Sequence, residues 1–115
     1  MTGLLFSPFQ LSLAASIQKQ QWFDRFFSPP KTIIIIDAGH GGIDPGSDSH
    51  GILEKDINLE IALKLQEVLH ENGYSVLMTR EDDNSLSLRE RSDFANEKEA
   101  DLFISLHQNC YAQDA

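Results

Sequence analysis

From residue 31 onward, some segments have the pattern of hydrophobic and polar residues expected of strands, and others have the pattern expected of helices. Residues 32–37 are a β-branched run typical of a strand buried on both faces, and residues 101–107 form another strand that is apolar on both faces. Residues 74–79 read as a strand between them. Residues 56–72 and 87–98 carry helical signals instead. The order strand, helix, strand, helix, strand predicts an α/β fold with a mainly parallel sheet.

The two predicted helices have recognisable features. The first carries an apolar stripe at helical spacing, formed by Ile57, Ile61, Leu65, Val68 and Leu69. Asn72-Gly73 supplies a left-handed stop for this helix. The second helix opens on a capping box from Ser87 to Glu90. Residues 38–55, between the first strand and the first helix, form a glycine-rich loop.

Residues 1–30 differ in composition from the rest of the chain. Residues 4–17 are mostly apolar but interrupted by polar residues, and no Lys or Arg precedes them, so the basic start of a signal peptide is missing. The segment is consistent with a weak export signal, a degraded anchor or a poorly ordered leader, with weak membrane association. Pro29-Pro30 is a natural boundary. This predicts a leader over residues 1–30 and a domain over residues 31–115.

Composition narrows the functional classes. The chain has 115 residues, enough for one small domain. Its formal net charge of −9 argues against a nucleic-acid partner, which favours a basic protein face. Its single cysteine, Cys110, excludes a disulfide within the chain. That cysteine is either a thiol ligand or nucleophile, or a small side chain in a loop.

Three side chains with metal-ligand chemistry flank the predicted strand ends. His40 follows the first strand, His107 ends the third, and Glu54 lies at the end of the glycine-rich loop. Sites in open parallel sheets form beyond the carboxyl ends of the strands. Two histidines and one carboxylate are the ligand set of a catalytic zinc site, so the sequence predicts Zn²⁺ at this rim. The other two histidines, His50 and His70, are expected on the solvated surface.

This ligand set constrains the strand order. Ligand atoms of one tetrahedral zinc lie about 3.3 Å apart, because each is about 2.0–2.1 Å from the ion. Neighbouring strands lie about 4.8 Å apart, so the first and third strands should be adjacent. The second strand then pairs on the other side of the first, which gives the order 2-1-3. Right-handed crossovers place helices on both faces, and the predicted fold has three layers.

Three more polar residues near this rim each have alternative interpretations. Asp37 either orients His40 or caps amides of the loop. Arg91, on the apolar face of the second helix, either anchors the Glu54 loop or the substrate, or extends its charged end to solvent. Arg80 lies just beyond the second strand, and its role is left undecided.

The residues around these sites resemble those of a known family. The resemblance rests on Asp37–Gly46, Leu53–Asp56, Thr79-Arg80, Leu88–Arg91, Ala95-Asn96 and Ser105–Asn109. In this order and spacing they closely resemble the N-acetylmuramoyl-L-alanine amidases of bacterial cell walls. The resemblance covers residues 33 to about 109, and the N-terminal leader is somewhat similar to that of members from spore germination.

The resemblance implies a hydrolase that cleaves the amide bond between N-acetylmuramic acid and L-alanine in peptidoglycan, in the cell envelope or outside the cell. It implies that His40, Glu54 and His107 bind Zn²⁺. It also implies a further glutamate, on a late strand, that acts as general base and acid. Residues 110–115 do not supply it. We therefore expect residues 31–115 to be the N-terminal part of the catalytic domain, incomplete at the C-terminus, with catalytic and substrate-binding residues unassigned.

Two alternatives stay open. A zinc carboxypeptidase uses the same ligand types on a related sheet. A truncated, inactive zinc-binding or wall-binding remnant predicts tight zinc binding without turnover. Product analysis on muropeptides separates the two enzymes, because an amidase releases a free L-alanine N-terminus and a carboxypeptidase shortens the peptide from its other end.

Overall fold

The structure is a computed structural model, and it describes residues 3, 5, 7–27 and 31–108. The chain divides into two compact units, residues 1–30 and residues 31–115. The placement of the two units relative to one another is not determined. Cys110 lies outside the described residues.

Most of the described part of the first unit is helix α1 (Pro8–Phe27). Ser7 precedes it, and the Ser7 hydroxyl accepts a hydrogen bond from the Gln10 backbone while the Gln10 side chain accepts one from the Ser7 backbone. This reciprocal cap, with proline in the first helical position, explains where the helix starts. None of the helices in the described residues is long and apolar enough to cross a membrane.

The second unit is built on a parallel three-stranded sheet in the order β4-β1-β5. Its strands are β1 (Ile33–Ala38), β4 (Ser75–Met78) and β5 (Leu102–Leu106). In chain order these are the first, second and third strands of the sheet, so the predicted order 2-1-3 is confirmed. Ile36 pairs with Met78 on one side and with Ile104 on the other, which brings all three carboxyl ends to one rim.

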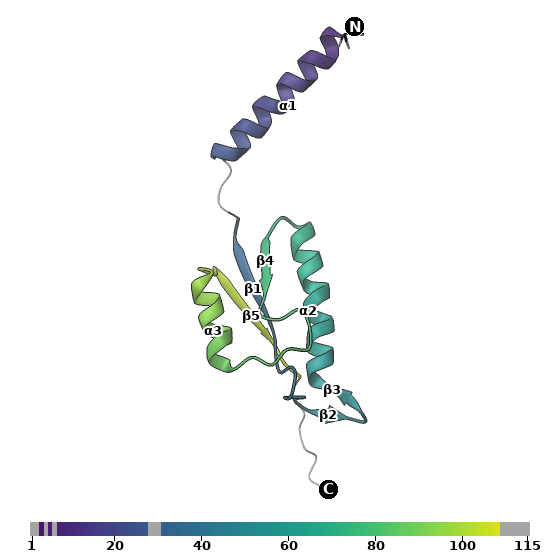
Figure 1. The fold of residues 1–115 in the computed structure, drawn as a ribbon, viewed down its shortest axis with the longest axis vertical. Helices are drawn as coiled ribbons and strands as arrows, with labels where there is room; N and C mark the ends of the chain where they lie inside the picture. The colour runs from purple at the N-terminus through teal and green to yellow at the C-terminus, as the bar shows by residue number, and fades with distance from the viewer. Residues whose placement is uncertain (1–2, 4, 6, 28–30, 109–115) are drawn as a thin grey trace. The chain divides into compact units, whose positions relative to one another are not determined.

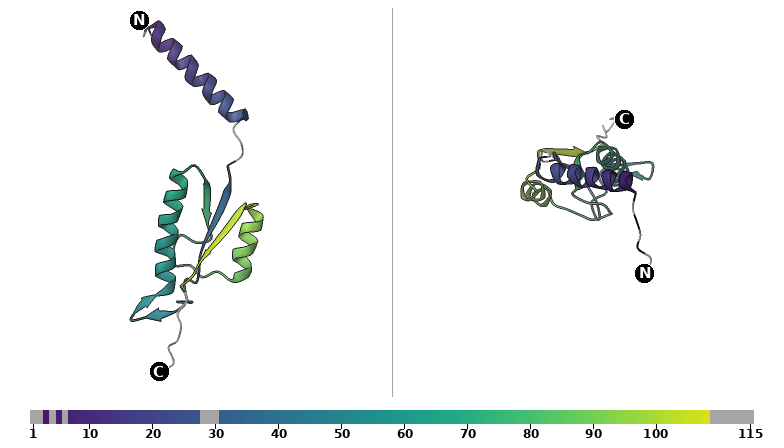
Figure 2. Two further views of the ribbon diagram at one scale, coloured as in Figure 1. Left: turned by 180° about the vertical axis from the view of Figure 1, so that it is seen from behind. Right: turned by 90° about the horizontal axis from the view of Figure 1, so that it is seen from above.

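Helices α2 (Glu54–Glu71) and α3 (Leu88–Glu97) flank this sheet, as Figures 1 and 2 show. Successive side chains of β1 point to opposite faces of the sheet. Ile36 packs in the core cluster that includes Ala62 of α2. The next residue, Asp37, reaches Arg91 of α3 instead. The two helices therefore cover opposite faces, and the predicted three-layer α/β architecture is confirmed.

The buried face of α2 matches the predicted stripe only in part, since Leu65 and Leu69 of the stripe pack against the core cluster. Ile61 is 41% exposed and Val68 is 52% exposed, although both were expected in the stripe. The fully or nearly buried residues are Glu54, Asn58 and Ala62. These three residues are spaced four apart and therefore lie on one face of the helix. That face is turned toward the sheet and toward the rim where the carboxyl ends of the strands meet. The face is rotated because it contains two polar residues that make buried hydrogen bonds there.

Two other features differ from expectation. The third strand of the sheet, β5, is apolar in sequence but partly exposed to solvent, with Leu102 49% and Phe103 41% exposed. In the described part of the chain β5 pairs only with β1, so one of its edges is unpaired. The glycine-rich loop also contains an unpredicted antiparallel pair of two-residue strands, β2 (Asp48–Ser49) and β3 (Ile52–Leu53).

The predicted start of α3 is confirmed in detail. The Ser87 side chain accepts a hydrogen bond from the Glu90 backbone, and the Glu90 carboxylate accepts one from the Ser87 backbone. Both partners of the capping box are thus present. This cap fixes the first turn of α3 and with it the position of Arg91, one residue further along.

Candidate metal centre

His40 lies in a tight turn directly after β1. Its backbone is in the left-handed region, with φ of 62°, and Gly41 and Gly42 also have positive φ. Gly41 forms a bridge with Asp44, because the backbone N–H of each donates to the carbonyl of the other at 2.9 and 3.1 Å. Left-handed backbone is costly for a residue with a side chain and is found mostly where the surroundings require it. The turn holds the His40 imidazole at the sheet rim.

Three predicted ligands converge at this rim. Nε2 of His40 lies 3.2 Å from Oε1 of Glu54, and Nδ1 of His107 lies 3.3 Å from the same oxygen. The two ring nitrogens are 3.2 Å apart. These separations match the roughly 3.3 Å between ligand atoms around one tetrahedral zinc ion. The donor set fits a divalent metal.

Glu54 is the buried member of the triangle, with 5% of its surface exposed. Burial raises the pKa of Glu54, but backbone N–H groups of Ser47 and Gln108 donate to its two oxygens, and the balance lowers the pKa to about 2. The carboxylate is therefore ionised at neutral pH. An anionic oxygen facing two imidazole nitrogens attracts a cation.

His107 is seated on Gly39. A side chain at position 39 would overlap the His107 imidazole and would come within 2.6 Å of the Leu106 carbonyl oxygen. The Gly39 backbone N–H donates to that same carbonyl at 3.0 Å. Only glycine leaves the imidazole of His107 the room it occupies. The close approach joins the end of β5 to the turn that carries His40.

Asp44 orients the His40 ring and was not singled out in the sequence. Its Oδ2 lies 2.8 Å from Nδ1 of His40. Its Oδ1 accepts a hydrogen bond from the Gly46 backbone at 3.1 Å, so the carboxylate is held on both sides. A carboxylate on one ring nitrogen places the proton there and leaves the other nitrogen free as a ligand. The only sequence signal was an aspartate four residues after His40 in a glycine-rich turn.

Both interpretations of Asp37 were wrong. Asp37 is 3% exposed and binds neither the His40 ring nor loop amides. It accepts hydrogen bonds from Thr79, Arg91 and Ser105, each at 2.7 Å. Burial raises the pKa of Asp37, yet these donors outweigh burial and lower it below its ordinary value. Asp37 therefore pairs with a buried arginine beneath the site.

Arg91 does not extend to solvent, because it is only 6% exposed. Its guanidinium donates to Asp37, to the carbonyls of Ala38 and His40 at 2.9 and 2.8 Å, and to Leu86. Arg91 thus anchors the turn that carries His40. An anchor for the Glu54 loop was one of the expectations. Arg80, left undecided in the sequence, is 4% exposed and donates to backbone carbonyls.

The remaining predictions concern residues away from the triangle. His50 and His70 are both exposed, as expected.

Asn58 is fully buried on α2 and donates to the Gly39 carbonyl at 3.2 Å. Lys55 donates to the Gly42 carbonyl and to Asp83, which in turn accepts from the Gly42 backbone. Sequence analysis missed these supports, because an asparagine inside a helix and a lysine at its start are ordinary surface residues.

The chain is similar to two N-acetylmuramoyl-L-alanine amidases of one bacterium. It is 45% identical over 78 residues to the sporulation-specific N-acetylmuramoyl-L-alanine amidase of Bacillus subtilis, covering 66% of this chain and 31% of that protein. It is 41% identical over 91 residues to the germination-specific N-acetylmuramoyl-L-alanine amidase of the same organism, covering 67% and 38%.

A solved structure shares the fold. The structure of an N-acetylmuramoyl-L-alanine amidase from Clostridium difficile 630 superimposes with a TM-score of 0.72 at 37% identity, over 75% of this chain and 48% of that one. The chain thus spans about a third of the length of the two Bacillus relatives and about half of this solved relative. The family model described as N-acetylmuramoyl-L-alanine amidase matches residues 34–115, and the chain therefore belongs to this family.

Proposed function

We propose that this chain is part of a zinc-dependent hydrolase that cleaves the amide bond between N-acetylmuramic acid and L-alanine in peptidoglycan. The observation that carries the proposal is the triangle formed by His40, Glu54 and His107, with sides of 3.2 to 3.3 Å. Family membership supports the choice of bond and substrate. None of the comparisons favours a zinc carboxypeptidase.

The side chains support zinc as the metal. Two imidazole nitrogens and one carboxylate oxygen are a common catalytic zinc set, whereas magnesium and calcium prefer oxygen ligands. In such a site a bound zinc ion supplies a Lewis acid and activates a water molecule. The protein's part is to present three ligand atoms already spaced for the ion. A contact from Asp44 orients His40. Hydrogen bonds from the backbone N–H groups of Ser47 and Gln108 hold the Glu54 carboxylate.

We assign residues 31–115 to part of the catalytic domain and residues 1–30 to a leader. The boundary between the two compact units falls after Pro30, and the family match begins at residue 34. The proposal assigns no general base and no substrate-binding residue. It places the protein in the cell envelope or outside the cell, where its substrate is found.

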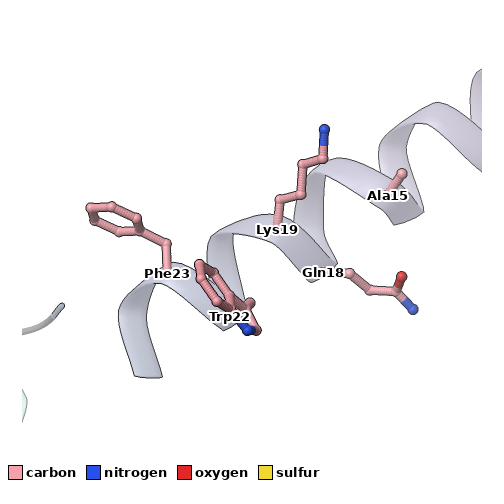
Figure 3. A pocket seen from close by; sticks show the side chains of 5 residues that line it. All are labelled: Ala15, Gln18, Lys19, Trp22 and Phe23. Carbon is pink, nitrogen blue, oxygen red and sulfur yellow. The ribbon is translucent and has the colours of Figure 1, made fainter. Parts of the chain in front are cut away.

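The leader is proposed to associate weakly with a lipid surface. Helix α1 carries exposed apolar side chains along its length, among them Phe9, Leu13 and Ile17. Near its end, Trp22 and Phe23 line a shallow hollow with Ala15, Gln18 and Lys19 (Figure 3). Aromatic residues beside cationic ones favour the membrane–water interface. Co-sedimentation with anionic vesicles, compared for the chain and its Trp22→Ser variant, tests this; equal sedimentation argues against it.

Metal binding tests the core of the proposal. Equilibrium competition with a chromophoric chelator is expected to give one tight zinc per chain. Alanine at His40, Glu54 or His107 should weaken binding beyond the roughly 10–100-fold typical of residues around the ligands. His70→Ala is the matched control, since this histidine is exposed and its ring bonds to the Val76 carbonyl. Unchanged zinc affinity in any of the three ligand variants contradicts the site.

Incubation with purified muropeptides tests the reaction. New L-alanine N-termini, found by amine labelling and mass spectrometry, support the amidase. Peptides shortened at the other end identify a carboxypeptidase instead. Tight zinc binding without turnover at high protein concentration limits this chain to a binding role.

A further inference from the structure

Arg80 joins the two ends of the loop that carries the proposed ligands. Its Nη2 donates to the carbonyl oxygens of Gly39, at 3.1 Å, and Lys55, at 2.8 Å. Gly39 directly precedes His40, and Lys55 directly follows Glu54. One guanidinium nitrogen therefore bridges the backbone neighbours of two ligands that lie far apart in the chain.

The other two nitrogens of the Arg80 guanidinium also donate to backbone carbonyls. Nε donates to the Ala38 carbonyl at 2.8 Å, and Nη1 donates to the Asp82 carbonyl at 3.0 Å. All four bonds end on backbone carbonyls, and residues 31–108 contain no carboxylate in ion-pair contact with Arg80. A planar fork with several fixed donors can satisfy four such acceptors, whereas the ammonium group of lysine is a single point with three donors.

Neighbouring backbone closes around the side chain. Arg80 is 4% exposed. A Cβ at Gly41 would lie 2.9 Å from its Nε, so the turn after His40 packs directly on the guanidinium. Burying a cation is costly unless its donors are satisfied. Here the carbonyls that satisfy it belong mainly to the segments on either side of the ligands.

We infer that Arg80 is a positioning residue, which sets the separation between His40 and Glu54 for metal binding. The inference rests on the proposed zinc site. Without the bridge, the loop carrying the two ligands remains attached through Arg91, Lys55 and the Asn58 bond to the Gly39 carbonyl, but it loses the guanidinium that joins the Gly39 and Lys55 carbonyls directly. The cost appears in zinc affinity, because the loop must then be ordered when the metal binds.

Zinc affinity measured by chelator competition tests this in the full chain, with Arg80→Lys and Arg80→Met as the variants. Both should bind zinc about 10–100-fold more weakly, as for other residues that orient ligands. The control is Val76→Ala, because Val76 is an apolar residue in the core of the same sheet, 3% exposed. It should lower the melting temperature while changing zinc affinity less than threefold.

The outcomes separate this inference from the proposed site. If the unmodified chain does not bind zinc through His40, Glu54 and His107, the proposed function itself fails. If it does bind, and Arg80→Lys binds equally well, only the role of Arg80 is overturned. A loss of affinity in Val76→Ala equal to that in the Arg80 variants, at similar melting temperature, overturns it as well.

An NMR measurement on the unmodified protein tests the role of Arg80 without variants that must fold. The Arg80 Nη protons should be visible by NMR in the metal-free chain, with slow rotation and slow exchange with water. Their resonances should persist when zinc is added, because the bridge is already formed. Freely rotating and rapidly exchanging Nη protons in the metal-free chain contradict the inference.

Discussion

Oδ2 of Asp44 lies 2.8 Å from Nδ1 of His40, on the side of the imidazole opposite to Glu54. This contact places the ring proton on Nδ1 and leaves Nε2, which is 3.2 Å from the Glu54 carboxylate, free to bind a metal. Asp44 is also tied to the backbone of Gly46. These two contacts of Asp44 hold the His40 imidazole with Nε2 facing Glu54.

Asp44→Ala is expected to weaken zinc binding about 10–100-fold, because His40 loses both its tautomer preference and its orientation. Asp44→Asn should weaken it less, since an amide oxygen still accepts the Nδ1 proton. Chelator competition gives the affinities, and ¹⁵N spectra of the imidazoles report the tautomer. Asp93→Ala, on the exposed face of α3, controls for the loss of one negative charge and should leave zinc affinity unchanged.

Gly39→Ala is expected to impair both stability and zinc binding. The new methyl group would overlap His107 and lie 2.6 Å from the Leu106 carbonyl oxygen, so the ring and strand end must move. Overpacking of this kind costs about 1–3 kcal/mol of unfolding free energy. The unfolding free energy is measured by urea denaturation, and zinc affinity by competition.

Gly51→Ala is the matched control for that substitution. Position 51 has open space around it but a positive φ of 83°. Alanine there should cost stability through backbone strain alone and leave zinc affinity intact. If Gly39→Ala loses no more zinc affinity than Gly51→Ala, the contact with His107 does not matter for the site.

The sequence predicts the sheet well, because its signals are local. The β-branched run at Ile33–Ile36 and the capping box at Ser87 each depend on a few neighbouring residues, and both appear as expected. The meeting of the two histidines at one rim was also predictable, because strand carboxyl ends in a parallel sheet converge. His40 and His107 meet for this reason, although 67 residues apart.

The supports of the site could not be predicted in the same way. Asp37 was assigned to the His40 loop because it is near His40 in sequence, but strand alternation points it to the opposite face, toward Arg91. The buried face of α2 was misjudged because Asn58, a polar residue, replaces an apolar one there to bind the Gly39 carbonyl. Long-range polar contacts of this kind leave no periodic pattern.

Removing one partner of the buried Asp37–Arg91 pair is expected to destabilise the domain strongly. The side chains of Arg91 and Asp37 are 7% and 4% exposed, and their contact is 2.7 Å. Asp37→Asn leaves an uncompensated buried guanidinium, which costs about 3–5 kcal/mol. Urea denaturation measures the change. Asp93→Asn, an exposed control, should change stability by less than about 0.5 kcal/mol.

A double-mutant cycle tests whether the pair acts as a unit. Adding Arg91→Met to Asp37→Asn removes the orphaned charge, so the double variant should be less destabilised than the sum of the two single variants. The coupling is expected at about 0.5–3 kcal/mol. Additive effects would mean that Asp37 acts mainly through Thr79 and Ser105, which also donate to it.

The same aspartate should give the domain an acid-dependent stability. The pKa of Asp37 in the folded chain is lowered, because hydrogen bonds from Thr79, Arg91 and Ser105 outweigh its burial. A group with a lowered folded-state pKa stabilises the fold fully above its unfolded pKa, about 3.9 for aspartate. That contribution is lost as the pH falls from there through the folded value.

The unfolding free energy of the unmodified chain is therefore expected to fall more steeply below about pH 4 than that of Asp37→Asn, which cannot titrate at this position. Between pH 5 and 7 the difference between the two proteins should be constant. Urea titrations in metal-free buffer across pH 2.5–7, with zinc removed so that the ligands do not contribute through binding, measure both. Parallel curves below pH 4 would mean that the carboxyl group of Asp37 is no better stabilised in the folded domain than in the unfolded chain, and that the Asp37–Arg91 pair contributes no charge stabilisation beneath the site.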